Sequence, residues 1–249
     1  MINGFNGTIS MISKIIALVP AAGTGTRLGD ALPKQYLDIN GMPMIFHALK
    51  ALAAVKRIDK IVVVLSPEDN HWRDFQSYWD NIGARISVAY VGGKTRGESV
   101  ANGLAHIEAE MAKSDWVMVH DAARPCLRTE LVEQFIDELE DDLIGGLLAL
   151  PLTDTIKLDD GADNRRVAKT IPREGIWRAQ TPQMFRFGLL KSALHDFIEA
   201  TDDAQAIEAT GHQPKLVMGD SVNLKVTYAP DLRLASLLLA VKMNEWNIK

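Results

Sequence analysis

The sequence predicts an α/β protein with a Rossmann-like, three-layer architecture, in which helices cover both faces of a mostly parallel sheet and a β-hairpin arm projects from it. Short apolar runs alternate with longer segments that have a helical spacing of apolar residues, which is typical of such a sheet. Glycine-rich or polar segments follow several of the apolar runs, as expected for loops beyond strand ends. The 249 residues, of which 47% are apolar and 24% charged, are sufficient for one sizeable core.

Five short apolar runs supply the first strands. Each is bounded by polar or turn-forming residues, which favours a short buried strand. These strands are predicted at 15–19, 60–65, 86–91, 116–119 and 145–150. A helical segment separates each strand from the next, so we expect the strands to be parallel.

Helices are predicted where apolar side chains recur every three or four residues. In the segment 42–55, for example, Ile45, Phe46 and Leu49 would share one apolar face. The predicted helices are 42–55, 67–81, 98–111, 130–139, 187–199, 203–210 and 230–241, the last with proline at its first turn. We expect the aromatic residues of the second helix to lie in the core: Trp72, Phe75 and Trp79.

The regular alternation ends after Pro151. The segments 155–158 and 167–171 flank a turn rich in Asp and Gly, which predicts a β-hairpin with few large apolar residues. Short strands are predicted further on, at 214–218 and 222–226. We expect residues 1–14 to be a flexible leader and 15–249 to be one domain, with the arm at about 152–178.

Composition and charge exclude several classes of protein. The formal net charge of −5 leaves no general basic surface for nucleic acid, so basic residues within motifs indicate a local anion site. Cys126 is the single cysteine, which excludes an intramolecular disulfide; we expect it to be a small packed residue in a reducing compartment. No apolar run approaches the ~20 residues of a membrane span. We therefore expect a cytoplasmic protein with neither nucleic acid nor membrane as a partner.

A glycine-rich loop follows the first strand. It consists of Ala21, Ala22, Gly23, Thr24, Gly25 and Thr26. Its backbone N–H groups can approach a phosphate chain closely, because glycine has no Cβ. Arg27 and Lys34 add two cations, which predicts an anionic, phosphate-bearing ligand. The loop is not a dinucleotide fingerprint, which would need glycine in place of Leu28, and not a P-loop, which would end in Gly-Lys-Ser/Thr. A plain tight turn without a ligand is the structural alternative.

Two further loops follow strands and are expected at the same sheet edge, where ligands of parallel sheets bind. In the segment 92–99, two glycines permit backbone contact with a flat base; alternatively, Ser99 simply lies near a helix start. In the segment 120–125, Asp121 and Arg124 either form a plain ion pair or serve a divalent metal or an acceptor. We expect His120 to be a packed strand-end residue rather than a metal ligand.

Together these motifs resemble those of nucleotidyltransferases that move a nucleoside monophosphate from an NTP onto a phosphorylated alcohol. The loop Pro-Ala-Ala-Gly-x-Gly-x-Arg-x-Gly and the later Pro-Lys-Gln carry the resemblance. Later motifs narrow it to the 2-C-methyl-D-erythritol 4-phosphate cytidylyltransferase family, over nearly the whole chain. They lie at 120–125, 153–157, 179–183, 201–202 and 223–227.

This resemblance implies transfer of CMP from CTP to 2-C-methyl-D-erythritol 4-phosphate, giving 4-diphosphocytidyl-2-C-methyl-D-erythritol and pyrophosphate in non-mevalonate isoprenoid synthesis. It also implies Mg²⁺ or another divalent cation, and a C₂ homodimer formed through the hairpin arm. An enzyme that uses a pentitol phosphate such as ribitol 5-phosphate remains an alternative. A non-catalytic nucleotide sensor on the same fold is an alternative of another class, and a nicotinamide-dependent oxidoreductase is disfavoured by the missing third glycine.

The resemblance also implies a role for each matching residue. The catalytic residues would be Arg27, Lys34 and Lys225. The nucleotide would be bound by Ala21, Ala22, Gly23, Thr24, Gly25, Gly93, Lys94 (through its backbone) and Ser99. The acceptor would be bound by Asp121, Arg124, Thr155, Arg173, Thr181, Thr201 and Lys225. Asp121 would also bind the metal, and Arg173 would reach the site of the neighbouring subunit.

Overall fold

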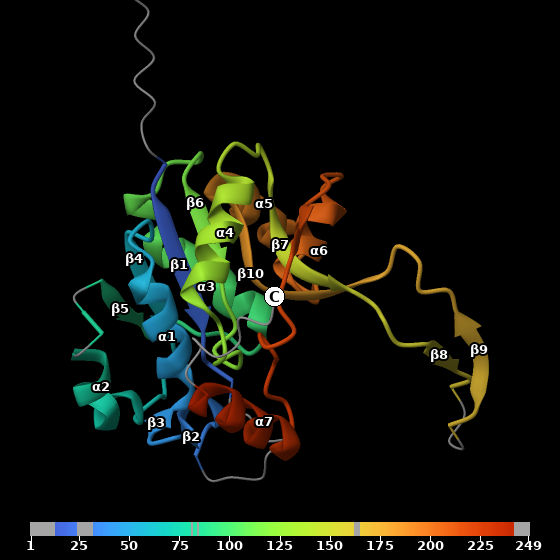
Figure 1. The fold of residues 1–249 in the computed structure, drawn as a ribbon. Coiled ribbons are helices and arrows are strands. Elements are labelled where there is room, and N and C mark those ends of the chain that lie inside the picture. The colour runs from blue at the N-terminus through green and yellow to red at the C-terminus, as the bar shows by residue number, and fades with distance from the viewer. Residues whose placement is uncertain (1–12, 24–31, 81, 84, 162–164, 242–249) are drawn as a thin grey trace, which may run out of the picture.

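The computed structural model describes residues 13–23, 32–80, 82–83, 85–161 and 165–241. Its centre is a seven-stranded sheet with the strand order β11-β7-β10-β6-β1-β4-β5 (Figure 1). The strands are β1 (Ile15–Pro20), β4 (Lys60–Val64), β5 (Ile86–Ala89), β6 (Trp116–Val119), β7 (Gly145–Pro151), β10 (Trp177–Arg186) and β11 (Lys215–Met218). Only β10 runs antiparallel to its neighbours, β6 and β7, so the mostly parallel sheet is confirmed for the described part of the chain.

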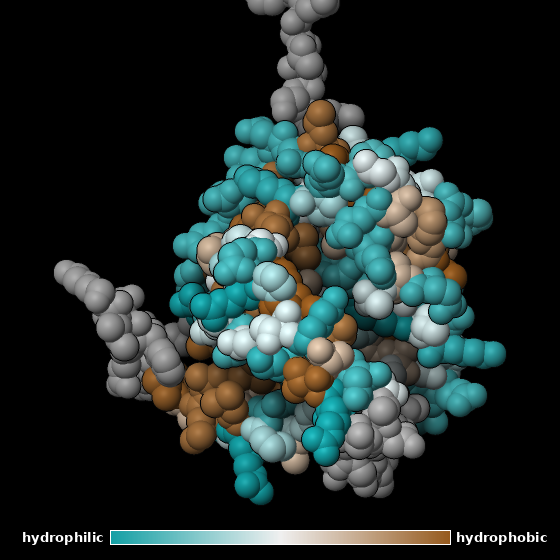
Figure 2. Space-filling view, turned by 90° about the vertical axis from the view of Figure 1, so that its right-hand side faces the viewer, coloured by the Kyte–Doolittle hydropathy of each residue, from teal (hydrophilic) through white to brown (hydrophobic). Residues whose placement is uncertain are grey.

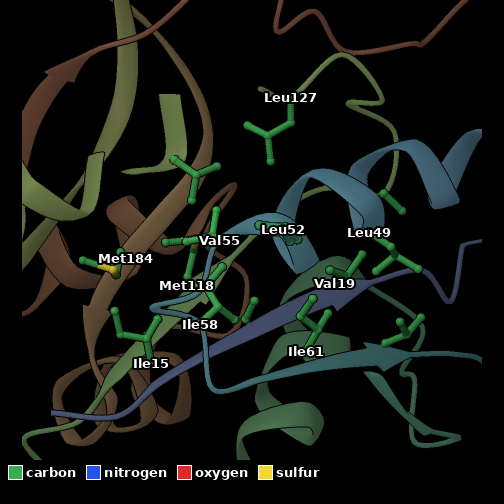
Figure 3. Close-up of a cluster of buried hydrophobic side chains, with 14 of the residues drawn as sticks. Ile15, Val19, Leu49, Leu52, Val55, Ile58, Ile61, Met118, Leu127 and Met184 are labelled. Atoms are coloured by element: carbon green, nitrogen blue, oxygen red, sulfur yellow. The ribbon is translucent and has the colours of Figure 1, made fainter. Parts of the chain in front are cut away.

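Helices pack on both faces of this sheet. They are α1 (Met44–Ala54), α2 (Gln76–Asp80), α3 (Arg96–Ile107), α4 (Thr129–Leu139), α5 (Phe187–Asp196), α6 (Asp203–Ala209) and α7 (Ala229–Ala240). Successive side chains of a strand point to opposite faces, so each buried strand contributes to two cores. In β1, Ile15 and Val19 join the core under α1 and α4, shown in Figure 3. Ile16 and Leu18 join the core that contains residues of α3 and α5.

The predicted helix 67–81 is only partly confirmed, because residues 67–71 are not helical and residues 72–80 are not one continuous α-helix. The chain forms a 3₁₀ turn, η3 (Trp72–Phe75), followed by the short α2. Asp69 explains the difference, because its Oδ1 accepts hydrogen bonds from the backbone N–H groups of His71 and Trp72, both at 3.0 Å. Such a local side-chain turn competes with a helix. Trp72 is buried against Phe46, with ring centroids 5.2 Å apart, as predicted for a core residue.

Two further differences lie near the end of the chain. The predicted strand 222–226 is a turn and an irregular segment. Strand β10 was not predicted, and its centre explains why: Gln180, Thr181 and Gln183 are polar but buried, so no apolar run marks the strand. Their side chains form hydrogen bonds within the fold, for example from Gln180 Nε2 to Asp220 O at 2.8 Å.

The hairpin arm is present as predicted. Strands β8 (Ile156–Asp159) and β9 (Val167–Ile171) form a separate two-stranded sheet that stands away from the body of the molecule (Figure 1). A second small sheet joins β2 (Asp38–Ile39) and β3 (Met42–Pro43), so the helix predicted from residue 42 begins at Met44. In the described segments, none of the helices has the length and apolarity needed to cross a bilayer. Residues 1–12 of the expected leader lie outside the described residues, and the domain limits stay a prediction.

Candidate active site

The three loops singled out in the sequence meet at one pocket, at the carboxyl ends of β1, β5 and β6. Pairing of β1 with β4 and β6 places these strand ends side by side. The pocket is lined by Pro20, Ala21, Ala22, Gly23, Lys34, Gln35, Gly93, Lys94, Thr95, Arg96, Ser99, Asp121, Ala122, Ala123 and Lys225. Predicted residues from all three loops are therefore brought together. Thr24, Gly25 and Arg27 lie outside the described residues.

The start of the glycine-rich loop is held by two hydrogen bonds. Ala21 donates its N–H to Val64 O, and its carbonyl accepts a hydrogen bond from the buried Gln35 side chain, both at 2.8 Å. The neighbouring loop approaches closely, because a Cβ at Gly92 would lie 2.3 Å from the Cβ of Ala22. Only glycine permits this approach, so the two loops lie against each other where residues of both line the pocket.

The loop 92–99 is shaped by the start of α3. Thr95 Oγ1 accepts a hydrogen bond from Glu98 N at 3.1 Å, and the Glu98 carboxylate accepts from the N–H groups of Lys94 and Thr95, which completes a capping box. Ser99 is buried, and its hydroxyl accepts from Gly93 N at 3.1 Å and donates to Thr95 O at 2.9 Å. Ser99 therefore orders the loop, and its direct contact with a nucleotide stays a prediction.

Four alternating charges form a network beside the pocket. Asp121 Oδ1 accepts a hydrogen bond from Arg96 Nε at 2.8 Å, and Asp121 Oδ2 lies 2.7 Å from Lys225 Nζ. The other end of the Arg96 guanidinium donates to Asp203 Oδ2, also at 2.8 Å. Asp203 is fully buried, whereas Lys225 is almost half exposed. The network thus extends from the protein interior to the pocket.

The pKa values in this network follow from burial and charge. Burial by itself raises the pKa of Asp121, but the cations of Arg96 and Lys225 outweigh it and hold that pKa well below its usual range. Burial likewise acts to lower the pKa of Arg96, and the two carboxylates outweigh it, so the pKa is raised. Burial raises the pKa of Asp203 against the attraction of Arg96. Asp121 is therefore a carboxylate throughout the physiological pH range.

The plain ion pair between Asp121 and Arg124 does not form. Arg124 is buried, and its guanidinium instead donates to the carbonyls of Asn223 at 2.7 Å and Ala179 at 3.4 Å. Arg124 therefore ties the segment that carries Lys225 to strand β10. The pairing of Asp121 with Arg96 and Lys225, and of Arg96 with Asp203, was not predicted. Arg96 was part of a motif without a role of its own, and Asp203 was noted only as a helix residue. No local pattern identifies this pairing, because it depends on how α3 and α6 pack.

His120 is a packed residue, as predicted. It is fully buried, and its Nδ1 lies 3.1 Å from Thr181 Oγ1 while its Nε2 lies 3.2 Å from Arg124 O. Because the Arg124 carbonyl can only accept, the proton is assigned to Nε2, and the Thr181 hydroxyl donates to Nδ1. Thr181 Oγ1 in turn accepts from Asp121 N at 3.0 Å. Thr181 therefore supports Asp121 from behind the pocket.

His120 is expected to make the protein less stable in mild acid. Burial lowers the pKa of His120 from 6.5 to about 4. As the pH falls through this interval, the unfolded histidine takes up a proton that the folded one does not, so the unfolding free energy decreases, by roughly 3 kcal/mol in full. Urea unfolding between pH 7 and pH 4 measures this decrease. In His120→Asn, the share of this decrease in unfolding free energy that is due to His120 should vanish, whereas the other titrating groups are the same in both proteins. Equal pH dependence of the unfolding free energy in the two proteins would contradict the prediction.

A second pocket adjoins the first. It is lined by Arg124, Arg178, Ala179, Gln180, Ser221, Val222, Leu224, Lys225, Asp231, Leu234 and Leu238. Lys225 lines both pockets, so it stands where they meet. Thr155, Arg173 and Thr201 line neither pocket. Thr155 and Arg173 lie on the projecting arm, where Arg173 donates to the carbonyl of Thr153. A single chain thus assembles part of the predicted site.

Comparison with known proteins identifies the relatives of this chain. The family model described as 2-C-methyl-D-erythritol 4-phosphate cytidylyltransferase matches residues 15–241. Proteins of that name from Thiobacillus denitrificans and Dechloromonas aromatica are 52% and 50% identical, over 93% and 91% of this chain and 99% and 97% of theirs. A crystal structure of a 4-diphosphocytidyl-2C-methyl-D-erythritol synthase superposes with a TM-score of 0.80 at 38% identity, covering 91% of this chain and 99% of that one. The Thermus thermophilus enzyme superposes with a TM-score of 0.73 at 30% identity, covering 92% and 100%.

Proposed function

The chain belongs to the 2-C-methyl-D-erythritol 4-phosphate cytidylyltransferase family, and from this we infer that it transfers CMP from CTP to 2-C-methyl-D-erythritol 4-phosphate. The products are 4-diphosphocytidyl-2-C-methyl-D-erythritol and pyrophosphate, in the non-mevalonate isoprenoid pathway. One observation of the site supports this reaction above others: Lys225 stands where a glycine-lined pocket meets a second, basic pocket. An enzyme that joins two phosphorylated substrates needs two such adjoining sites.

In this reaction, a phosphate oxygen of the acceptor attacks the α-phosphorus of CTP and expels pyrophosphate. Both reactants are anions, and negative charge spreads over the transferring group, so catalysis depends on positioning and on neutralising charge. Lys34 and Lys225 both line the pocket and are suited to this task. The backbone N–H groups of Ala22 and Gly23 are suited to the phosphates, because that of Ala21 is already donated to Val64 O. We assign Arg27 to the same task from its motif.

The second pocket suits the phosphate of the acceptor. Its lining includes the cations Arg124, Arg178 and Lys225 and a single carboxylate, Asp231. Asp231 is already used at the start of α7, where Oδ2 accepts from Thr227 N and Tyr228 N at 2.9 and 2.8 Å. The buried Nε of Arg124 has no hydrogen-bond partner among the described residues. The pocket therefore carries excess positive charge, which favours a phosphate ligand.

The pocket also has a donor for a divalent cation. Asp121 is largely buried and lines the pocket. One of its carboxylate oxygens accepts from Arg96 and the other pairs with Lys225, so each oxygen has a second lone pair left for a metal ion. No cluster of three or more acidic, histidine or cysteine side chains accompanies it within the described segments. This set fits Mg²⁺, which commonly takes one or two carboxylates together with substrate phosphates and water. When bound, Mg²⁺ would neutralise phosphate charge, with Asp121 as its protein ligand.

We further propose a homodimer in which each arm serves the partner. The arm exposes Leu158 and Val167, at 47% and 61%, although a monomeric hairpin gains nothing from such residues. Leu216 and Met218 are also exposed on the edge strand β11, which pairs with the strand that leads into the arm. Figure 2 views the side from which the arm projects and shows an apolar patch in its lower part. If a second copy covers the exposed apolar side chains of the arm and of β11, Thr155 and Arg173 of each arm can reach the pocket of the other chain. The cytoplasmic location stays a prediction.

Mixed dimers test this arrangement. Arg173→Ala and Lys34→Ala should each lose most activity alone, whereas their heterodimer should regain activity, because one of its sites combines an intact Lys34 with an intact arm. The matched control pairs a wild-type chain with a Lys34→Ala/Arg173→Ala chain. If the arm serves the partner, both sites of that control heterodimer are defective. Activity in the control and none in the first pair would show that each arm serves its own chain.

The reaction itself is tested by pyrophosphate release from the purified full chain with Mg²⁺, CTP and 2-C-methyl-D-erythritol 4-phosphate. Parallel reactions replace CTP by the other NTPs, replace the acceptor by ribitol 5-phosphate, or add EDTA. We expect release with CTP and the methylerythritol phosphate and its loss in EDTA. Release with ribitol 5-phosphate alone would assign the enzyme to the pentitol phosphate. CTP binding without release from any pair would indicate a nucleotide sensor.

A further inference from the structure

The guanidinium of Arg96 occupies an unusual place in the site. Its Nε and Nη2 donate to two different carboxylates, Asp121 and Asp203, each at 2.8 Å. We propose that Arg96 is a positioning residue: it holds the Asp121 carboxylate in one orientation and so places the Lys225 ammonium at the meeting of the two pockets. This inference rests on the cytidylyltransferase reaction proposed above.

Arg96 is itself held from two sides. It is the first residue of α3, directly after the N-cap Thr95, whose capping box orders this turn. Next to it, a Cβ at Gly97 would lie 2.4 Å from the carbonyl oxygen of Ile198. Glycine therefore lets the first turn of α3 lie against the segment that leads into α6. The position of the Arg96 backbone is thus determined by packing between two elements.

The second carboxylate, Asp203, is an equally fixed support. It begins α6, is fully buried, and follows the N-cap Asp202. The Gln183 side chain of β10 holds this helix start, because Nε2 donates to Asp202 Oδ2 at 2.9 Å and Oε1 accepts from Ala204 N at 2.8 Å. Asp203 therefore anchors Arg96 to the interior, although it does not line the pocket itself.

This support acts on Lys225 through Asp121. Arg96 takes Oδ1 of Asp121, so the remaining oxygen, Oδ2, faces Lys225 Nζ at 2.7 Å. Lys225 has a long, flexible and half-exposed side chain, which needs such a contact to keep its ammonium in one place. A lysine at position 96 would keep the positive charge, but a single ammonium does not reproduce the rigid, planar fork that spans two carboxylates.

The alternative role for Arg96 is structural, in which its charge merely compensates two buried carboxylates. The two roles differ in their dependence on Lys225. If Arg96 acts by placing Lys225, its replacement has little left to disturb once Lys225 is gone. If Arg96 only stabilises the fold, its replacement lowers kcat by the same factor with or without Lys225. A double-mutant cycle separates the two.

The experiment uses the full chain and compares wild type, Arg96→Lys, Lys225→Met and the double variant in the pyrophosphate-release assay, with thermal unfolding of each. We expect Arg96→Lys to lower kcat by on the order of 10²-fold, as a displacement of about 1 Å does elsewhere. When Lys225→Met is already present, adding Arg96→Lys should cause little further decrease in kcat. Arg57→Lys is the matched control, because Arg57 also bridges carboxylates, those of Asp137, Glu140 and, at 3.8 Å, Glu133, on the protein surface. It should keep wild-type kcat.

Two results would overturn the proposal. One is near-wild-type kcat in Arg96→Lys; the other is an equal loss in both backgrounds. If Arg96→Lys does not fold, Asp203→Asn takes its place in the same cycle, because it weakens the support of Arg96 outside the pocket. Inactive wild-type protein would refute the proposed reaction instead, so the two failures are distinguishable.

Discussion

Replacing Lys225 by methionine is expected to lower kcat by on the order of 10²–10³-fold, the usual cost of losing one charge-stabilising donor in a preorganised site. Lys225 Nζ lies 2.7 Å from Asp121 and stands where the two pockets meet. There it can neutralise charge on the acceptor phosphate and on the transferring group. Methionine keeps much of the side-chain length and removes only the cation. Steady-state kinetics with varied acceptor would give kcat and KM separately.

Lys215→Met provides the matched control for this substitution. Lys215 Nζ also lies 2.7 Å from a carboxylate, that of Glu138, and its side chain is 43% exposed compared with 45% for Lys225. It lies on the edge strand β11, away from both pockets. We expect Lys215→Met to keep wild-type kcat. Equal turnover in the two variants would remove Lys225 from the catalytic set.

Replacing Arg27 by alanine should have a similar effect, a decrease in kcat of on the order of 10²–10³-fold with a modest change in CTP affinity. Arg27 belongs to the glycine-rich loop, whose preceding residues Ala21–Gly23 line the pocket. A cation that acts on charge developing in the transition state contributes to kcat rather than to ground-state binding. CTP binding and turnover must therefore be measured on the same variant.

Arg73→Ala is a suitable control for the loss of an arginine, because Arg73 is exposed on η3 and lines neither pocket. It should leave both kcat and CTP affinity unchanged. Turnover of Arg27→Ala close to wild type would exclude Arg27 from transition-state stabilisation. Normal turnover at saturation with a much weaker affinity for CTP would instead assign it to ground-state binding of the triphosphate.

Elements with a strong local pattern could be predicted from the sequence. Strand β6 was predicted at 116–119, where it lies, because all four residues are apolar and fully covered. The loops after β1, β5 and β6 were expected at one edge of the sheet, and the pocket lies there. The hairpin arm followed from an Asp-rich turn between two short segments. The strand and the hairpin depend on neighbouring residues alone, and the common edge of the loops follows from the parallel arrangement of the strands.

Elements whose identity depends on distant partners could not be predicted in this way. Strand β10 is polar at its centre, and it is a strand because Gln180 and Thr181 find hydrogen-bond partners in other segments. The turn that shortens the helix predicted at 67–81 is local by contrast: Asp69 accepts from two nearby backbone N–H groups, which the spacing of apolar residues does not reveal.

The sequence by itself determined the alternation of strands and helices and the resemblance to cytidylyltransferases, and it predicted that the loops bind phosphate. These properties reside in short motifs, whose chemistry is set by the residue types within them. Only the tertiary structure decided which charges meet. Asp121 pairs with Arg96 and Lys225 rather than with Arg124, and Arg96 reaches Asp203. Ion pairs act over a few ångströms, and the packing of α3, α6 and the segment before α7 brings these side chains within that distance.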